Sequence, residues 1–129
     1  MVTADTDVLI RYLTNDDPEK AARFGRFIIK KGQTIAISDV TFAEIFFVLT
    51  KRYGYPSNEV ATKLALLVEN SSVRCNKPRM LSTLSILANR NISLADAYCA
   101  AVAIETTSGR VLSFDHDFDK IAGIKRIEP

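Results

Sequence analysis

The chain has 129 residues, with 17 lysines and arginines against 15 aspartates and glutamates, so its formal net charge is only +2. Apolar residues make up 47% and charged residues 25%, which excludes a disordered chain and suits one globular domain. The near balance of charge argues against a strongly basic nucleic-acid binder. The longest apolar run, 97–104, is far shorter than the roughly 20 residues that span a bilayer.

The N-terminus and the cysteines favour a cytoplasmic protein. Asp5 and Asp7 stand where a secretory signal would carry basic residues. Cys75 and Cys99 form no CxxC pair, so they indicate neither a disulfide framework nor a zinc site. The single histidine, His116, excludes a metal site built from several histidines. We expect one domain over residues 1–129, in the cytoplasm, that does not enter a membrane.

Short apolar runs alternate with amphipathic stretches along the chain. This alternation predicts strands at 2–4, 34–37, 73–75, 111–114 and 124–127. It predicts helices at about 8–13, from 18 onward, and at 39–53, 57–69, 78–89 and 94–106, with a helical turn at 116–121. Strands separated by helices require crossover connections, which make a parallel sheet covered by helices on both faces. The expected fold is α/β, a three-layer α/β/α sandwich around a central five-stranded parallel sheet.

The ends of these helices carry capping signals. Ser, Asp and Asn are favoured N-caps because their side-chain oxygens accept from free backbone N–H groups, and Gly is favoured just beyond a C-terminus. The predicted N-caps are Asp17, Ser38, Ser57 and Ser93, and Gly109 is predicted to end the helix at 94–106.

Two acids follow predicted strands directly. Asp5 comes after the first strand and Asp115 after the strand at 111–114. Ligands of open parallel sheets bind at the carboxyl ends of the strands, which makes both residues candidates for a site. Taken singly, each is better explained as the N-cap of the next helix, because Asp is a preferred cap where a strand leads into a helix.

Two further acids lie within helical patterns. Glu44 projects from a largely apolar stripe, where an ionised carboxylate is costly unless it is paired or bound to metal. The alternative is a salt bridge or an exposed helix edge. Asp96 has small apolar helical neighbours that leave room above it, but Ser93-x-x-Asp96 also fits a capping box. Asp117 is a further acid at a helix start, and His116 beside it is interpreted as a solvated loop histidine.

The acids Asp5, Glu44, Asp96 and Asp115 point to chemistry if they converge. Each like-charged pair about 4 Å apart costs roughly 4 kcal/mol at an effective dielectric constant of about 20, so such a cluster needs cations. Oxygen ligands without His or Cys select Mg²⁺ or Mn²⁺. Such ions can generate hydroxide, orient a phosphodiester and stabilise the departing oxygen. The set therefore indicates metal-assisted phosphodiester hydrolysis.

At these residues the chain resembles the PIN domain family, and within it the VapC-type toxins of bacterial and archaeal toxin–antitoxin pairs. The resemblance rests on segments 5–18, 38–44, 94–97 and 111–118, in the family's order and over essentially the whole chain. It implies a Mg²⁺- or Mn²⁺-dependent endoribonuclease that cleaves RNA, is usually a homodimer, and is held inactive by an antitoxin.

The resemblance also assigns residues. The family's four acids correspond to Asp5, Glu44, Asp96 and Asp115, with Asp117 as an additional metal ligand. Thr6 and Ser113 occupy positions where members carry supporting hydroxyls. Asp7 stands where members usually carry Asn, so it adds a negative charge near the metals.

Charge along the chain offers a candidate RNA surface. Segment 70–95 contains no acid, and its bases are Arg74, Lys77, Arg79 and Arg90. They either contact an RNA backbone or form an ordinary solvated face. Setting aside five acids (Asp5, Glu44, Asp96, Asp115 and Asp117) as a metal-neutralised cluster leaves ten against 17 bases, a balance of +7. The net charge of +2 is then the sum of an acidic pocket and a basic exterior.

Two alternatives stay open. A catalytically silent PIN-like module that binds RNA or protein would keep the fold without activity. This alternative stays open because Asp7 stands where family members usually carry Asn. A receiver-like phosphoacceptor domain also has this length and an acidic cluster, but it needs an Asp after its third strand, where this chain has Asn76 and Lys77.

Overall fold

The computed structural model describes residues 1–30 and 32–129, and this part of the chain forms six α-helices and five short strands. The helices are α1 (Thr6–Thr14), α2 (Pro18–Ile29), α3 (Asp39–Phe47), α4 (Ser57–Glu69), α5 (Lys77–Asn89) and α6 (Leu94–Thr106). The strands are β1 (Val2–Thr3), β2 (Ile35–Ala36), β3 (Val73–Arg74), β4 (Arg110–Leu112) and β5 (Lys125–Ile127). A π-helical turn, η1 (Val48–Arg52), continues α3, and a 3₁₀ turn, η2 (His116–Lys120), follows β4. None of these described helices has both the length and the hydropathy of a membrane-crossing segment.

Capping explains most helix boundaries. The side chains of Asp17, Ser38 and Ser93 each accept from the backbone N–H three residues further on, at 3.2, 3.1 and 3.1 Å. These three predicted caps are confirmed. The prediction for Ser57 is wrong, because Pro56 occupies the cap position and Ser57 is the first helical residue. Proline fits there since the helix needs no hydrogen bond from its nitrogen.

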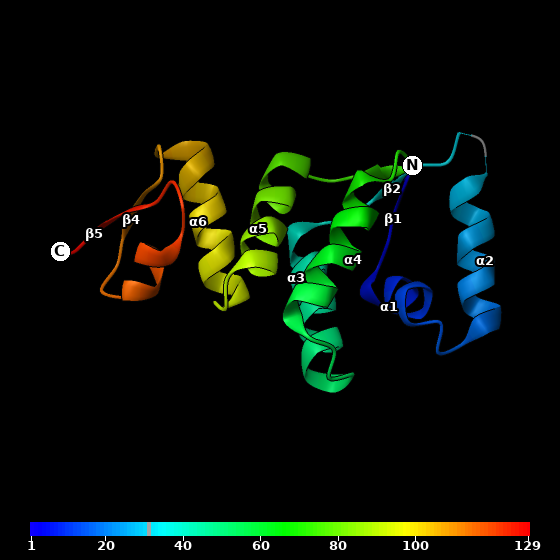
Figure 1. Cartoon of the computed structure of the whole chain (residues 1–129). Helices are drawn as coiled ribbons and strands as arrows, with labels where there is room; N and C mark the ends of the chain where they lie inside the picture. Colours follow the sequence, from blue (N-terminus) through cyan, green and yellow to red (C-terminus); the bar gives the residue numbers. More distant parts are fainter. Residues whose placement is uncertain (31) are drawn as a thin grey trace.

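The strands do not join into one sheet. A parallel three-stranded sheet has the order β1-β2-β3, and β4 and β5 form a separate parallel pair. Figure 1 shows the two sheets well apart, with α3 to α6 between them and α2 beyond the three-stranded sheet. The α/β class and the parallel strands are confirmed, but the three-layer sandwich around one five-stranded sheet is not. Strands of two or three residues form few ladder hydrogen bonds, so the packing of the attached helices decides where they lie.

Two apolar clusters follow this division. The larger one joins α1, α3, α4 and α5 to the three-stranded sheet, and its most buried side chains include Leu9, Ile35, Phe42, Ile45, Leu64 and Leu84. The smaller one fixes the β4–β5 pair and η2 to α6 through Ala100, Ala103, Val111, Phe118 and Ile121. Each sheet is therefore anchored by its own cluster, and the helices connect the two.

A polar network ties α3, α5 and α6 together. Tyr98 Oη on α6 donates to Asp39 Oδ2 on α3 at 2.6 Å, and Arg79 Nη1 on α5 lies 3.4 Å from the same oxygen. Arg79 Nε also donates to Glu105 Oε2 at 2.8 Å. This hydrogen bond raises the pKa of Arg79 and lowers the pKa of Glu105. The network fixes how α6, and the sheet attached to it, sits against α3.

We predict that Gly109→Ala lowers the free energy of unfolding by about 3 kcal/mol or more, measured by urea denaturation. Gly109 has φ +82°, and a Cβ there would lie 1.9 Å from the carbonyl oxygen of Gly123. The backbone must therefore shift, in addition to adopting a conformation that favours glycine.

Gly54→Ala is the matched control, since Gly54 has φ +73° but nothing within 4 Å of an added Cβ. It tests the backbone strain alone, which costs about 1 kcal/mol. Equal losses for the two variants would contradict the close approach of Gly109 to Gly123.

Candidate metal centre

Three carboxylates gather where β4 leads into η2. Asp96, in the first turn of α6, and Asp115 and Asp117, on either side of His116, each place an oxygen within 4.8 Å of the other two. Asp96 reaches this position because Ser93 caps its helix. Its carboxylate joins the other acids, so the capping pattern does not account for its side chain.

The turn after β4 is shaped by the residues of the site. The backbone N–H of Asp115 donates to Ser113 Oγ at 2.9 Å, and the N–H of Asp117 donates to Asp115 Oδ1, also at 2.9 Å. Asp115 is therefore the N-cap of η2, which is one of the two roles that its position after a strand predicted. One carboxylate oxygen serves the cap, and the other remains for a cation.

A lysine already balances part of this negative charge. Lys120 Nζ donates to Asp117 Oδ1 at 2.9 Å, and this hydrogen bond is the main reason why the pKa of Lys120 is raised. Lys120 follows Asp117 by three residues, and this spacing could have indicated the ion pair from the sequence. A group made of three carboxylates, without a histidine or cysteine among its members, fits a hard divalent cation such as Mg²⁺ or Mn²⁺.

A second group of predicted residues lies at the other sheet. Thr6 is buried and its Oγ1 donates to Glu44 Oε2 at 2.8 Å, which orients that carboxylate. Asp5 and Glu44 both line a cavity of about 520 Å³, together with Arg52. Glu44 is exposed rather than enclosed by apolar residues. Its helical neighbour Phe47 is 59% exposed, so this face of α3 is open.

The structure does not unite the two groups. Within the described part of the chain, the group of three carboxylates includes neither Asp5 nor Glu44. Asp5 directly follows β1, and α3 to α6 separate β1 from the β4–β5 pair (Figure 1). Each group therefore holds only part of the acid set that the sequence predicts.

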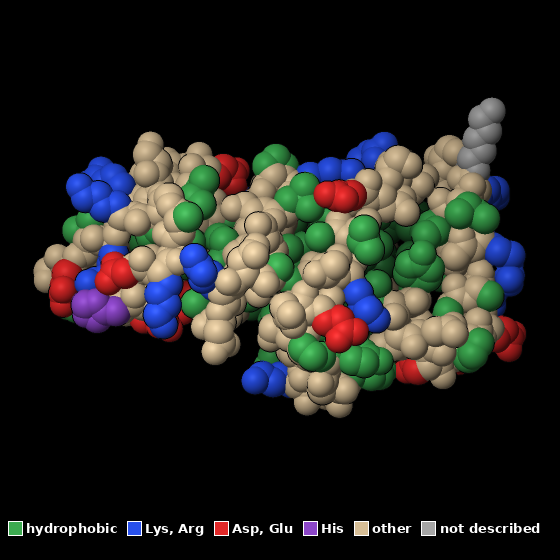
Figure 2. Space-filling model, in the orientation of Figure 1, with side chains coloured by type: hydrophobic (Ala, Val, Ile, Leu, Met, Phe, Trp, Pro, Cys, Tyr) green, Lys and Arg blue, Asp and Glu red, His purple; other side chains and the backbone are tan. Residues whose placement is uncertain are grey.

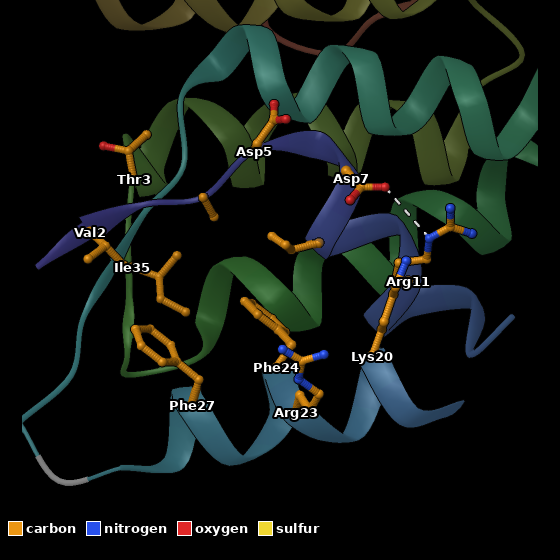
Figure 3. Close-up of a pocket in the computed structure, with 12 residues that line it drawn as sticks. Val2, Thr3, Asp5, Asp7, Arg11, Lys20, Arg23, Phe24, Phe27 and Ile35 are labelled. Atoms are coloured by element: carbon orange, nitrogen blue, oxygen red, sulfur yellow. Dashed lines mark ion pairs between the residues drawn. The ribbon is translucent and has the colours of Figure 1, made fainter. Parts of the chain in front are cut away.

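Asp7 does not share the direction of Asp5. In the close-up of Figure 3, Asp5 points toward α3, whereas Asp7 points toward Arg11. Asp7 Oδ1 lies 3.6 Å from Arg11 Nε, and Arg11 Nη1 also donates to Asp16 Oδ2 at 2.7 Å. The additional charge of Asp7 is thus balanced by a residue that the sequence analysis did not single out. Its spacing of four residues from Asp7 was the available signal.

The four bases of the candidate RNA surface do not form one patch. Arg79 belongs to the network with Asp39 and Glu105, and Arg90 Nε donates to the carbonyl of Lys120 at 3.0 Å. Arg74 and Lys77 lie near the end of β3 and contact backbone carbonyls. Figure 2 shows blue side chains at several separate places on its visible face.

His116 is an exposed residue of η2. Its Nδ1 lies 3.1 Å from Asp119 Oδ2 and 3.0 Å from Arg126 Nη2. These contacts suit a surface histidine, in keeping with its interpretation from sequence.

Comparison with known proteins decides the family. The family model described as the PIN domain matches residues 2–124. The chain belongs to the PIN domain family. PIN domains are typically nucleases. No curated protein matches this chain significantly. Among solved structures it is similar to the Mycobacterium tuberculosis toxin VapC20, which cleaves the sarcin-ricin loop, with 20% identity over 100% of both chains and a TM-score of 0.44.

We predict that Lys120→Met strengthens Mn²⁺ binding to this PIN domain by about two- to fivefold, measured by calorimetric titration. The ammonium group competes with the cation for Asp117, and the substitution removes it while keeping a long side chain. Lys125→Met is the control for net charge, because Lys125 lies on β5, outside η2. Equal effects of the two variants would show that only net charge matters.

Proposed function

We propose that this PIN domain is a Mg²⁺- or Mn²⁺-dependent endoribonuclease and the toxin of a VapBC-type toxin–antitoxin pair. The observation that supports this most directly is the group formed by Asp96, Asp115 and Asp117 on a chain of a nuclease family. Carboxylate oxygens within 4.8 Å of one another repel and favour a shared cation.

The proposed roles follow from the side chains. Asp96, Asp115 and Asp117 hold the divalent cation. When bound, such an ion lowers the pKa of a coordinated water and stabilises charge that develops on a phosphodiester. Glu44, oriented by Thr6, and Asp5 supply the remaining carboxylates of the nuclease site. Ser113 holds the turn that presents Asp115.

The proposed partners are an RNA substrate and a cognate antitoxin, with the toxin acting as a homodimer in the cytoplasm. Arg74 and Lys77 are the candidate bases best placed to meet a phosphate backbone, because acids of the chain do not engage them in the described structure. Arg79 is engaged by Asp39 and Glu105, so we assign it a structural role.

Two observations argue against the alternative functions, a catalytically silent module and a phosphoacceptor domain. Asp7 lines the cavity that Asp5 and Glu44 share, but it pairs there with Arg11, which balances its charge and weakens the case for a silent module. The turn after β3 carries Cys75 and Asn76 where a phosphoacceptor domain needs an aspartate.

We predict that the purified protein cuts single-stranded RNA with Mn²⁺, and that a chelator stops the reaction. Asp96→Asn and Asp115→Asn should each lower the cleavage rate by at least about a hundredfold, because each removes a cation ligand. The measurement is the initial rate on end-labelled RNA.

Glu59→Gln is the matched control for loss of one negative charge. Glu59 lies in the first turn of α4, and the group of three carboxylates does not include it. Full activity of Asp96→Asn would exclude the assigned metal centre. Inactivity of the wild-type protein on both RNA and DNA would exclude a nuclease.

A further inference from the structure

Both sheets end in a strand with an unused edge. In the described part of the chain, β1 pairs only with β2, and β4 pairs only with β5. The N–H groups of Val2 and Ala4 donate toward β2, so the alternation of a strand directs the N–H of Thr3 to the open side. Ser113 N donates to Ile127, which directs the N–H of Leu112 outward in the same way. Such edges attract a further strand unless they are covered.

An apolar cavity lies between β1 and α2. It has a volume of about 670 Å³, and Phe24, Phe27 and Ile35 line it together with Val2 (Figure 3). Its charged lining consists of three bases, Arg11, Lys20 and Arg23, and two acids, Asp5 and Asp7. Because Arg11 pairs with Asp7, the cavity suits a strand with apolar side chains, with Lys20 and Arg23 as bases for acids that follow it.

The end of β4 has these properties. Leu112 and Phe114 are both 69% exposed, an unusual state for two large apolar side chains so close together. Asp115 and Asp117 follow them directly. The end of β4 thus carries exposed apolar side chains that can fill the cavity, and acids that can meet Lys20 and Arg23.

The same chain cannot bring its β4 to its β1 without breaking its packing. The smaller apolar cluster fixes Val111 and Phe118 to α6. Tyr98 and Arg79 in turn hold α6 to Asp39 on α3. In this arrangement α3 to α6 lie between β1 and β4 (Figure 1). A second copy of the chain is the available source of β4 for the open edge of β1.

We infer that two copies exchange their ends, so that β4 of each copy pairs with β1 of the other. This inference rests on the proposed nuclease function. If the strands pair in parallel, as all other pairs in this structure do, their carboxyl ends meet at one edge. Asp5 and Asp115 follow those ends, so each nuclease site combines Asp5 and Glu44 from one copy with Asp96 and Asp115 from the other. The exchange is reciprocal and closes as a twofold dimer.

Mixing two inactive variants tests this arrangement. Asp5→Asn and Asp96→Asn are each expected to be inactive alone. In a mixed dimer, one site combines both substitutions and the other contains neither. Random pairing of equal amounts after refolding together should restore about a quarter of the wild-type rate.

Asp5→Asn mixed with Glu44→Gln is the matched control. Both substitutions lie on the same half of the site, so every site of a mixed dimer stays defective and no activity returns. Recovery in the first mixture alone supports exchange. If wild-type protein cuts RNA but neither mixture recovers, the site forms within one chain and the exchange is wrong, while the nuclease proposal stands.

A cross-linking experiment tests the exchange without measuring RNA cleavage. Thr3→Cys and Leu112→Cys are combined in a chain in which Cys75 and Cys99 are replaced by serine, and the protein is oxidised. Exchange predicts a covalent dimer on a non-reducing gel. An internal disulfide in a monomer, or no disulfide, overturns the inference. This result is independent of whether the protein proves to be a nuclease.

Discussion

The packing of α6 against α5 is the constraint on which the arrangement of this molecule depends. A polar network joins both helices to α3 at Asp39, which accepts from Tyr98 and lies beside Arg79. Most of the stabilising free energy comes from apolar burial, since each fully buried Leu or Met such as Met80 and Leu84 contributes about 1.5–3 kcal/mol. The polar network is partly exposed and screened by water, so it adds less stability. It instead selects one orientation of α6, and therefore the position of β4, β5 and the acids beyond them.

This constraint explains which parts of the fold the sequence predicts well. Helices are local structures, and their caps at Asp17, Ser38 and Ser93 depend on residues three positions apart. Sheet order is a long-range property. β1 and β2 have only two residues each, too few for side-chain alternation to specify a partner strand. The five strands could be predicted from local patterns, but their division into two sheets depends on helix packing that no local pattern encodes.

The same distinction applies to the candidate site. Asp115 was identifiable because it follows an apolar strand, and Asp96 because small residues surround it on a helix. Their meeting with Asp117 follows from α6 packing against the β4–β5 pair, a contact between neighbouring elements. The position of Asp5 relative to these acids depends on β1 and β4, which are far apart in sequence. Lys120 and Arg11 were overlooked because a charged residue near an acid usually has no role beyond solvation.

The distribution of positive charge gives a second reason to expect that Asp5 and Glu44 share one site with the carboxylate group at β4. The bases nearest the clustered acids are engaged within the chain, since Lys120 pairs with Asp117 and Arg126 pairs with Asp119. Arg52, in contrast, lines the cavity shared by Asp5 and Glu44. A phosphate backbone is attracted by bases and is cleaved beside a metal centre. Under the proposed function, with the metal centre at β4 and Arg52 in the cavity beside Asp5, the substrate has to contact both. An arrangement that brings β1 and β4 side by side satisfies this requirement. Neither the β1 region nor the β4 region of one chain does so alone.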